Sequence, residues 1–232
     1  MIDYFAGDVA ARYDSSTAGM PVQPVVDFLL PLAGGGALEL AIGTGRIAVP
    51  LAARGVRVAG IDLSPDMVAQ LRQKTEEIPV TIGDMSTTKV EGTFSVAYIV
   101  FNSIFNLRTQ DQQVACFENA AAHLEPGGRF VVEIMVPELQ RLPRGDRFLL
   151  FDAQPEHVGF DEYDLVTQEL ISHHYAPERG DYTITPGRYI WPSELDLMAR
   201  LAGMGLRERW ADWDRSPFTA ESDKHVSVWQ KT

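Results

Sequence analysis

The stretch 37–51 constrains the fold of this chain more than any other. It reads ALELAIGTGRIAVPL, an apolar run that breaks at Gly43-Thr44-Gly45 and then continues with helical spacing. This pattern predicts a buried strand over 37–42, a tight turn and a helix over 47–54. The first N–H groups of a helix have no intrahelical partner, and glycine lets a ligand approach the backbone closely. The stretch therefore predicts a binding place for a nucleotide-sized ligand.

Further strands and helices alternate along the first 136 residues. The pattern predicts two short helices within 1–33, helices that begin at Ser64 and span 109–124, and strands over 57–62, 78–82, 94–101 and 129–135. The run 94–101 is almost entirely apolar, which is typical of a central parallel strand covered on both faces. This alternation predicts an α/β fold with a doubly wound, mostly parallel sheet.

The rhythm changes after residue 136. Short alternating runs separated by glycine and proline predict an antiparallel β insertion after the fifth strand, with strands at 148–151, 163–175 and 182–191. A helix capped by Ser193 and a terminal strand pair, with one antiparallel strand, complete the pattern at 193–202, 206–213 and 225–230. We expect three units, namely an N-terminal helical cap over 1–35, a Rossmann-like domain over 36–136 and 193–232, and an inserted antiparallel substrate lid over 137–192.

Composition limits the classes of partner. The chain has 232 residues, which suits one domain with a modest insertion, and 20 basic against 32 acidic residues give a formal charge of −12. Without a basic run, binding to nucleic acid or to an anionic membrane is not expected, because both depend on Lys and Arg. Cys116 is the only cysteine, so no intrachain disulfide forms. No long apolar run or leader pattern is visible, which favours a cytoplasmic protein.

Polar residues follow four consecutive predicted strands. Gly43 and Gly45 follow the first strand, Asp62 ends the second, Asp84 follows the third and Asn102 follows the fourth. The carboxyl ends of the strands form the ligand crevice in a doubly wound sheet. Asp62 lies 19 residues after Gly43, a spacing at which a carboxylate meets ribose hydroxyls, and Asp84 is placed to accept from an exocyclic amine.

Two cofactor patterns overlap in the glycine turn. The run from Gly43 to Ala48 satisfies G-x-G-x-x-A, the dinucleotide fingerprint. The second pattern is led by Glu39, as Glu39-x-Ala41-x-Gly43-x-Gly45, and is accompanied by GIDLSPDM at 60–67, GDM at 83–85 and LEPGGR at 124–129. Together these motifs resemble class I S-adenosylmethionine-dependent methyltransferases over residues 36–136. The chain departs from the family at Ala41, where glycine is usual, and at Ile42.

The resemblance implies S-adenosyl-L-methionine as cofactor and S-adenosyl-L-homocysteine as product. Gly43 and the backbone near Ala41 would lie against the methionine part, Asp62 on the ribose, and Asp84 and Met85 on the adenine. The full set of implied cofactor-binding residues is Tyr13, Glu39, Ala41, Gly43, Gly45, Asp62, Leu63, Met67, Asp84, Met85, Phe101 and Asn102. The segment 99–107 and the β insertion resemble small-molecule methyltransferases of sugar and natural-product pathways. A small metabolite is therefore the expected partner, with a homodimer left open.

The implied reaction is in-line methyl transfer to an O or N atom. A hydroxyl acceptor needs a general base, and the candidates are His173, His174 and Glu133. Neighbouring strand residues face opposite sides, so at most one of the two histidines enters the cleft. No metal-ligand spacing is present, so no metal is expected.

Two other functions stay open. A nicotinamide-dependent oxidoreductase leaves Glu39 and Asp84 unexplained and lacks a Tyr-x-x-x-Lys pair. A non-catalytic S-adenosylmethionine-binding module would keep the cofactor residues and have a filled acceptor cleft.

Overall fold

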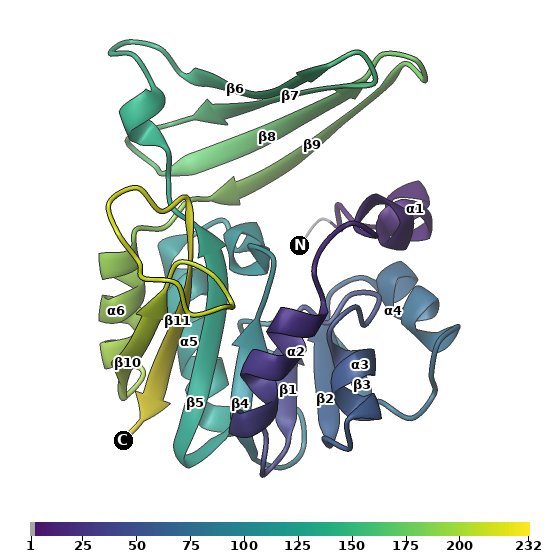
Figure 1. The fold of residues 1–232 in the computed structure, drawn as a ribbon, viewed down its shortest axis with the longest axis vertical. Helices are drawn as coiled ribbons and strands as arrows, with labels where there is room; N and C mark the ends of the chain where they lie inside the picture. The colour runs from purple at the N-terminus through teal and green to yellow at the C-terminus, as the bar shows by residue number, and fades with distance from the viewer. Residues whose placement is uncertain (1–2) are drawn as a thin grey trace.

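A computed structural model describes residues 3–232 and contains two β-sheets (Figure 1). The larger sheet has the strand order β10-β11-β5-β4-β1-β2-β3. Its strands are β1 (Ala37–Leu40), β2 (Val58–Asp62), β3 (Val80–Ile82), β4 (Phe94–Ile99), β5 (Leu124–Met135), β10 (Met204–Trp210) and β11 (Lys224–Lys231). β1 pairs in parallel with both β2 and β4, whereas β11 is antiparallel to β5 and β10. The predicted doubly wound, mostly parallel sheet with an antiparallel terminal strand is confirmed.

Helices cover both faces of this sheet. α5 (Gln110–His123) and α6 (Pro192–Leu201) pack on one face, and α2 (Gln23–Leu29) and α3 (Ala48–Ala53) pack on the other (Figure 1). On the first face the Phe117 ring meets Phe130 and Trp229 edge to face, with centroids 4.9 and 5.3 Å apart. On the second, Phe28 meets Trp213 at 5.3 Å. The two cores explain why 94–101 is apolar on both sides.

Local signals set the helix starts. α4 (Pro65–Arg72) begins as predicted, because the Ser64 hydroxyl accepts a hydrogen bond from the Met67 N–H and Pro65 takes the first helical position. The prediction of Ser193 as the cap of α6 is wrong by two residues. The cap is Trp191, whose N–H donates to the Glu194 carboxylate, and proline again takes the first helical position.

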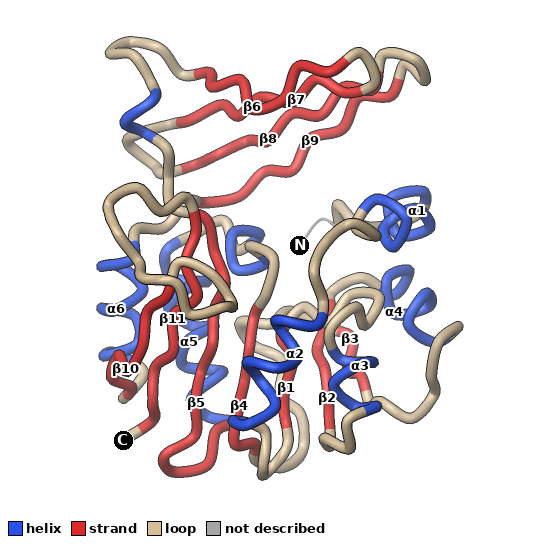
Figure 2. The backbone as a smooth tube through the Cα atoms, viewed as in Figure 1, coloured by secondary structure: helices blue, strands red, loops and turns tan. Residues whose placement is uncertain are grey.

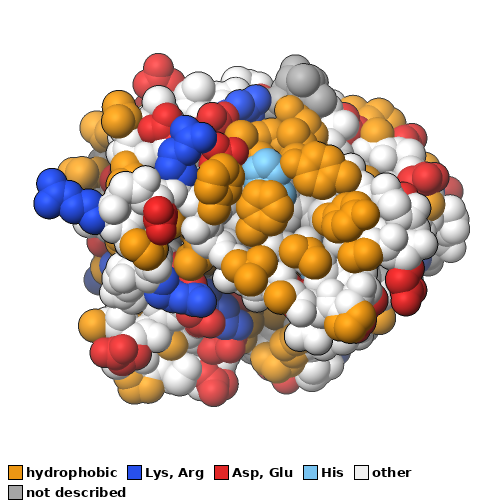
Figure 3. Space-filling model, turned by 90° about the horizontal axis from the view of Figure 1, so that it is seen from above, with side chains coloured by type: hydrophobic (Ala, Val, Ile, Leu, Met, Phe, Trp, Pro, Cys, Tyr) orange, Lys and Arg blue, Asp and Glu red, His pale blue; other side chains and the backbone are white. Residues whose placement is uncertain are grey.

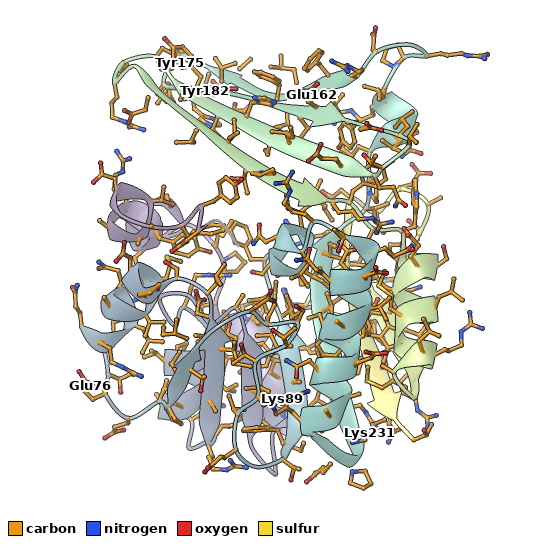
Figure 4. The ribbon with its side chains drawn as sticks, turned by 180° about the vertical axis from the view of Figure 1, so that it is seen from behind. Glu76, Lys89, Glu162, Tyr175, Tyr182 and Lys231 are labelled. Carbon is orange, nitrogen blue, oxygen red and sulfur yellow. The ribbon has the colours of Figure 1, made fainter. Side chains whose placement is uncertain are left out.

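β5 begins at Leu124, five residues before the predicted start at 129. Leu124 pairs with Phe94, and the next pair joins Arg129 to Val96, so the four residues between them bulge out of the ladder. Gly127 has a φ of 78°, which suits this bulge. The far end of α5 is closed by Lys231, whose ammonium donates to the carbonyls of Ala121 and Leu124. This lysine and Lys89 lie at the end of the sheet remote from the second sheet (Figure 4).

The insertion forms the second sheet, with the strand order β6-β7-β8-β9. Its strands are β6 (Phe148–Gln154), β7 (His157–Tyr163), β8 (Glu169–Ala176) and β9 (Asp181–Arg188). The predicted strand over 163–175 is wrong because residues 164–168 form a turn. The Asp164 carboxylate accepts the N–H groups of Val166 and Thr167, and Gln168 has a φ of 60°. Leu165 and Val166 are apolar in sequence, which led to the strand prediction, but both side chains are exposed in the turn.

The second sheet lies over the carboxyl ends of the parallel strands (Figure 2). Two connections join it to the core, one before β6 with a short helical turn η3 (Leu139–Arg141), and one between β9 and α6. The turn η2 (Ser103–Asn106) contacts β9. The face of the second sheet that points away from the core exposes an apolar patch around a histidine (Figure 3). The exposed apolar residues of its strands include Phe148, Leu150, Tyr175, Tyr182 and Ile184.

Residues before β1 form α1 (Asp8–Ser16), α2 and a turn η1 (Leu30–Leu32), in agreement with two short helices. The first two residues of the expected cap over 1–35 lie outside the described part of the chain. α1 packs beside α4, and the Gly7 N–H donates to the Asp66 carboxylate at 2.7 Å. Within residues 3–232, none of the helices has the length and apolar character needed to cross a membrane.

Candidate active site

A cavity of about 570 Å³ opens between the carboxyl ends of β1, β2 and β4 and the inner face of the second sheet. Its volume falls within the range of about 300–1,000 Å³ typical of small-molecule sites. Gly45 is the one implied cofactor residue that does not line it, and Gly45 lies instead at an adjacent smaller hollow with Arg46 and Val49. The cavity is lined by Tyr13, Glu39, Ala41, Gly43, Asp62, Leu63, Met67, Asp84, Met85, Phe101 and Asn102.

The Asp62 carboxylate joins the first two strand ends. One of its oxygens accepts the Gly43 N–H at 2.6 Å, and the other accepts the Ser64 N–H at 2.9 Å. Burial raises the pKa of this carboxyl, and the two backbone donors oppose that rise. A carboxylate oxygen has two lone pairs, so each oxygen keeps one for a further donor. Asp62 can therefore hold the glycine turn and still accept hydrogen bonds from a ligand.

Backbone conformation explains the glycines of the turn. Gly43 and Gly45 have φ values of 55° and 77°, which favour glycine. A Cβ at Gly43 would lie 3.1 Å from the Met67 methyl carbon, and one at Gly45 would lie 3.0 Å from Leu71. Gly45 therefore packs the turn against α4 from behind, which accounts for its place outside the cavity.

Glu39 is a buried carboxyl on the cavity floor. The Tyr98 hydroxyl donates to it at 2.9 Å. Burial raises the pKa of Glu39 to about 8, an effect that Tyr98 and the Arg46 guanidinium oppose. A ligand ammonium in the cavity would favour the ionised carboxylate, as nearby opposite charge does in general. Glu39 thus fits the amino group of an amino-acid tail.

The α1 helix brings Tyr13 over the turn. Burial raises the pKa of Tyr13 to about 12, so its hydroxyl stays a proton donor at neutral pH. The ring meets Phe5 edge to face at 6.5 Å. Asp3, Tyr4 and Phe5 also line the cavity, and no motif identified them in the sequence.

Asp84 and Met85 lie at the end of β3, with Leu63 opposite. One Asp84 oxygen accepts both the N–H and the hydroxyl of Ser86, at 2.8 and 2.7 Å. The other oxygen has no hydrogen bond from the described residues, so it is free to accept from an exocyclic amine. Leu63, Met67 and Met85 supply an apolar wall for a flat ring.

The end of β4 is strained and is held by Glu133. Phe101 and Asn102 have φ values of 54° and 61°, which are uncommon for residues with side chains. The Glu133 carboxylate accepts the Phe101 N–H and the Trp213 indole N–H, both at 2.8 Å, and the Asn102 amide oxygen accepts the Met135 N–H at 2.7 Å. Glu133 does not line the cavity. The structure therefore gives this candidate base a positioning role.

The two histidine candidates lie on opposite faces of β8, as strand alternation predicts. His174 lines the cavity, whereas His173 stacks on Phe160 on the outer face, with centroids 4.5 Å apart. Burial lowers the pKa of His174, so its ring is neutral at pH 7. Its nitrogens contact the Ser172 hydroxyl at 3.2 Å and His157 at 3.1 Å.

The side of the cavity formed by the second sheet contains residues that the sequence interpretation missed. Asp161, Ser172 and Thr185 come from three neighbouring strands of the second sheet, and Phe105, Phe151 and Leu170 add apolar surface. Alternation along a correctly placed β7 is the signal that could have identified Asp161. Within residues 3–232, no three His, Cys, Asp or Glu side chains group as a metal site.

Comparisons with known proteins agree with this architecture. A family model for a methyltransferase domain matches residues 37–128. The structure is similar to the CcbJ methyltransferase from Streptomyces caelestis, with a TM-score of 0.86 and 36% identity over 99% of this chain and 98% of that one. S-adenosylmethionine-bound CalS10 from Micromonospora echinaspora has the same fold, with a TM-score of 0.71 and 20% identity over the full length of both chains.

Curated relatives match a part of this chain. The dTDP-3-amino-3,4,6-trideoxy-alpha-D-glucopyranose N,N-dimethyltransferase of Streptomyces venezuelae is 33% identical over 96 residues, which are 41% of this chain and 40% of that protein. A dTDP-3-amino-3,6-dideoxy-alpha-D-glucopyranose N,N-dimethyltransferase of Streptomyces fradiae is 36% identical over 41% of this chain and 38% of that protein. These matches span about two fifths of each curated relative.

The strand order, the glycine turn and the three strand-end carboxyls define a Rossmann-like methyltransferase fold. The chain belongs to the class I S-adenosylmethionine-dependent methyltransferase family.

Proposed function

We propose that this chain transfers the methyl group of S-adenosylmethionine to a small metabolite. Of the two acceptor atoms considered, O and N, we propose the nitrogen of an amine. The observation that carries the proposal is one cavity in which the cofactor turn faces the buried Asp161 carboxyl of the second sheet. A carboxylate attracts an ammonium group and repels an oxyanion. The names of two curated relatives, both N,N-dimethyltransferases of amino sugars, support the same acceptor class.

In this proposal each carboxyl in the cofactor half of the cavity has a task. Glu39 takes the ammonium of the amino-acid tail, Asp62 takes the ribose hydroxyls, and Asp84 takes the exocyclic amine of adenine. Leu63, Met67 and Met85 hold the adenine ring, and Tyr13 covers the tail from above. These contacts fit the donor and acceptor groups that line the cavity.

The cofactor supplies a methyl group that is already activated on a sulfonium. The protein must therefore align the acceptor with that carbon and keep water out. Orientation of two reactants can lower a barrier by about 7–11 kcal/mol. Phe101 and Asn102, fixed by Glu133, form the floor between the two halves, and Phe105, Phe151 and Leu170 exclude water on the acceptor side. The second sheet acts as the substrate lid over 137–192.

Thermal shift with S-adenosylhomocysteine, NADH and NADPH tests the cofactor. A ligand at 100 times its Kd stabilises a protein by about 2.7 kcal/mol, or about 5–11 °C for a chain of this length. We expect this shift with S-adenosylhomocysteine alone. A shift with NADH and none with S-adenosylhomocysteine would favour an oxidoreductase instead.

A second assay separates an enzyme from a binding module. The protein is incubated with S-adenosylmethionine and a panel of small amines, including amino sugars, amino acids and cyclic secondary amines, each paired with its hydroxyl analogue. Release of S-adenosylhomocysteine with amines and not with the hydroxyl analogues is the expected result. Cofactor binding without release in any pair would contradict the proposed catalysis.

A further inference from the structure

A chain of polar groups crosses the inner face of the lid sheet. It begins at Asp152 on β6, whose carboxylate lies 2.6 Å from His157 Nδ1. His157 Nε2 lies 3.1 Å from His174 Nδ1, and His174 Nε2 lies 3.2 Å from the Ser172 hydroxyl. Ser172 is the register partner of Asp161 across β7 and β8, so the two side chains lie on the same face of the sheet, and Ser172 lowers the pKa of the Asp161 carboxyl. Four groups from three strands thus form one hydrogen-bonded path, and Asp161 lies beside its inner end, opposite Ser172.

The two ends of the path differ in their access to water. Asp161 is 8% exposed and, together with Ser172 and His174, lines the cavity. The side chains of His157 and Asp152 at the other end are 33% and 32% exposed. Strand register fixes this course, because Asp161 pairs with Ser172 across β7 and β8, and Gly159 pairs with His174. The path therefore leads from the acceptor space to solvent.

Hydrogen-bond donors along the path allow two consistent arrangements. In the first, the Asp161 carboxylate accepts from Ser172, Ser172 accepts from His174 Nε2, and His174 Nδ1 accepts from a doubly protonated His157 that is paired with Asp152. In the second, Asp161 carries a proton and donates to Ser172, Ser172 donates to His174 Nε2, and both imidazoles are neutral. The two arrangements contain the same number of protons. They differ in which nitrogen of His174 carries its proton and in whether the extra proton lies at the buried end or at the exposed end.

We propose that Asp161 removes the proton of the acceptor ammonium and that Ser172, His174 and His157 carry that proton to solvent. This inference rests on the proposed methyl transfer to an amine. The ammonium loses one proton to the Asp161 carboxylate and becomes a neutral amine, and the path passes a proton out through His157. The nitrogen lone pair then forms the bond to the methyl carbon, and the carbon–sulfur bond breaks with its electron pair on sulfur. The products are the methylated ammonium and the neutral thioether.

The charges around the path support this direction of transfer. Burial, together with the nearby Glu138 carboxylate, raises the pKa of Asp161, which makes it a better base than an exposed aspartate, while Ser172 and His173 oppose the rise. Burial and the neighbouring imidazoles of His157 and His173 lower the pKa of His174, so this ring passes a proton on without keeping it. Asp152 is the carboxylate placed to stabilise the charged form of His157 at the exit.

The deciding experiment uses the full-length protein with S-adenosylhomocysteine and needs no acceptor. Long-range proton–nitrogen NMR spectra at pH 7 report which ring nitrogens of His157 and His174 carry protons. We expect His174 to be protonated on Nε2 in the wild type, with its Nδ1 accepting a hydrogen bond from His157. Asp161→Asn should move the His174 proton towards Nδ1, and this effect should disappear when Ser172→Ala breaks the path. Tyr175→Phe, an exposed position on the other face of the same strand, is the matched control and should change neither ring.

Two results would overturn the path. One is a His174 tautomer that Asp161→Asn leaves unchanged, because the inner end of the path would then not be coupled to the imidazole. The other is an effect of Asp161→Asn on the His174 tautomer that persists in the Ser172→Ala background. Asp161 would then influence His174 by direct electrostatic interaction and not through the Ser172 hydroxyl.

Turnover gives a second readout, with the panel amine that releases the most S-adenosylhomocysteine as the probe. Ser172→Ala should lower kcat/KM at least tenfold at pH 7 and less than threefold at pH 9, where more of the amine arrives neutral. Equal losses at both pH values would refute proton removal through the path. If no panel amine is methylated, the proposed acceptor class fails, while the NMR comparison still decides whether the path exists.

Discussion

Ala41 adopts a left-handed backbone conformation, with a φ of 63°, at the position where the family usually has glycine. This conformation costs a residue with a side chain about 1–2 kcal/mol. Glycine removes that cost, but it destabilises the folded state by about 0.5–1 kcal/mol because it loses more conformational entropy on folding than alanine does. We expect Ala41→Gly to raise the free energy of unfolding by up to about 1 kcal/mol, or about 2–4 °C in Tm. Gly43→Ala is the matched control and should lower Tm, because it adds strain and a 3.1 Å contact with Met67. A lower Tm for Ala41→Gly would show that the turn prefers alanine.

Glu39 makes stability depend on pH. Its pKa is about 8 in the folded protein against an ordinary 4.5, so between these values the unfolded chain loses a proton that the folded one keeps. The free energy of unfolding therefore falls as pH rises through this window. We expect Glu39→Gln to raise the Tm of the ligand-free protein at pH 9 by at least about 2–4 °C, equivalent to about 1 kcal/mol, and to leave it unchanged at pH 4. The same variant should bind S-adenosylmethionine more weakly. A Tm difference that is the same at both pH values would contradict the buried, protonated carboxyl.

Single residues were predictable where the strand ends specify them. Glu39, Asp62 and Asp84 follow buried strands, and parallel strands bring their carboxyl ends together. Glu133 could not be interpreted in this way, because its role depends on Trp213, which is 80 positions away in the chain and joins it only in the folded protein.

At the scale of elements, Gly187 lets the lid sheet approach the core. A Cβ there would lie 2.2 Å from the Phe105 ring and 2.4 Å from the Phe105 carbonyl oxygen. Gly187→Val should therefore displace β9 from η2 and lower kcat/KM for the amine at least tenfold, while S-adenosylhomocysteine still raises Tm. Gly205→Ala, where a Cβ meets open space, is the matched control and should keep turnover. Full activity of Gly187→Val would show that this contact does not position the lid.

Elements with strong local signals were predicted well. The Ser64-Pro65 start of α4 and the apolar run 94–101 are local patterns, and both are present in the structure. The lid was harder because its strands are partly exposed and the turn at 164–168 contains Leu165 and Val166. In that region, the hydrogen bonds that Asp164 accepts stabilise a turn, although the sequence is apolar.

At the scale of the whole molecule, the formal charge of −12 should favour a cationic donor over a neutral product. S-adenosylmethionine has one more positive charge than S-adenosylhomocysteine. The screening length shortens from about 30 Å at 0.01 M salt to about 8 Å at 0.15 M. We expect the association rate of S-adenosylmethionine to fall several-fold over this range and that of S-adenosylhomocysteine to stay nearly constant, as measured by stopped flow. Equal salt dependence of the two would exclude electrostatic steering.

The doubly wound sheet could be predicted from the sequence, because short right-handed crossover connections allow few strand orders. The placement of the lid over the cavity could not, since it depends on contacts such as that between β9 and η2, which lie far apart in the chain.

The lid sheet leaves the core after β5 and returns to it before α6, at one end of the larger sheet (Figure 1). A segment attached in this way behaves as an exchangeable cassette. Under the proposed function, a change of length or sequence between these two points would remodel the acceptor wall, whereas the hydrogen bonds of Asp62 and Glu39 are made between residues of the core. New acceptor preferences can thus arise in evolution by variation of one continuous stretch of gene, while the methyl donor site is inherited intact.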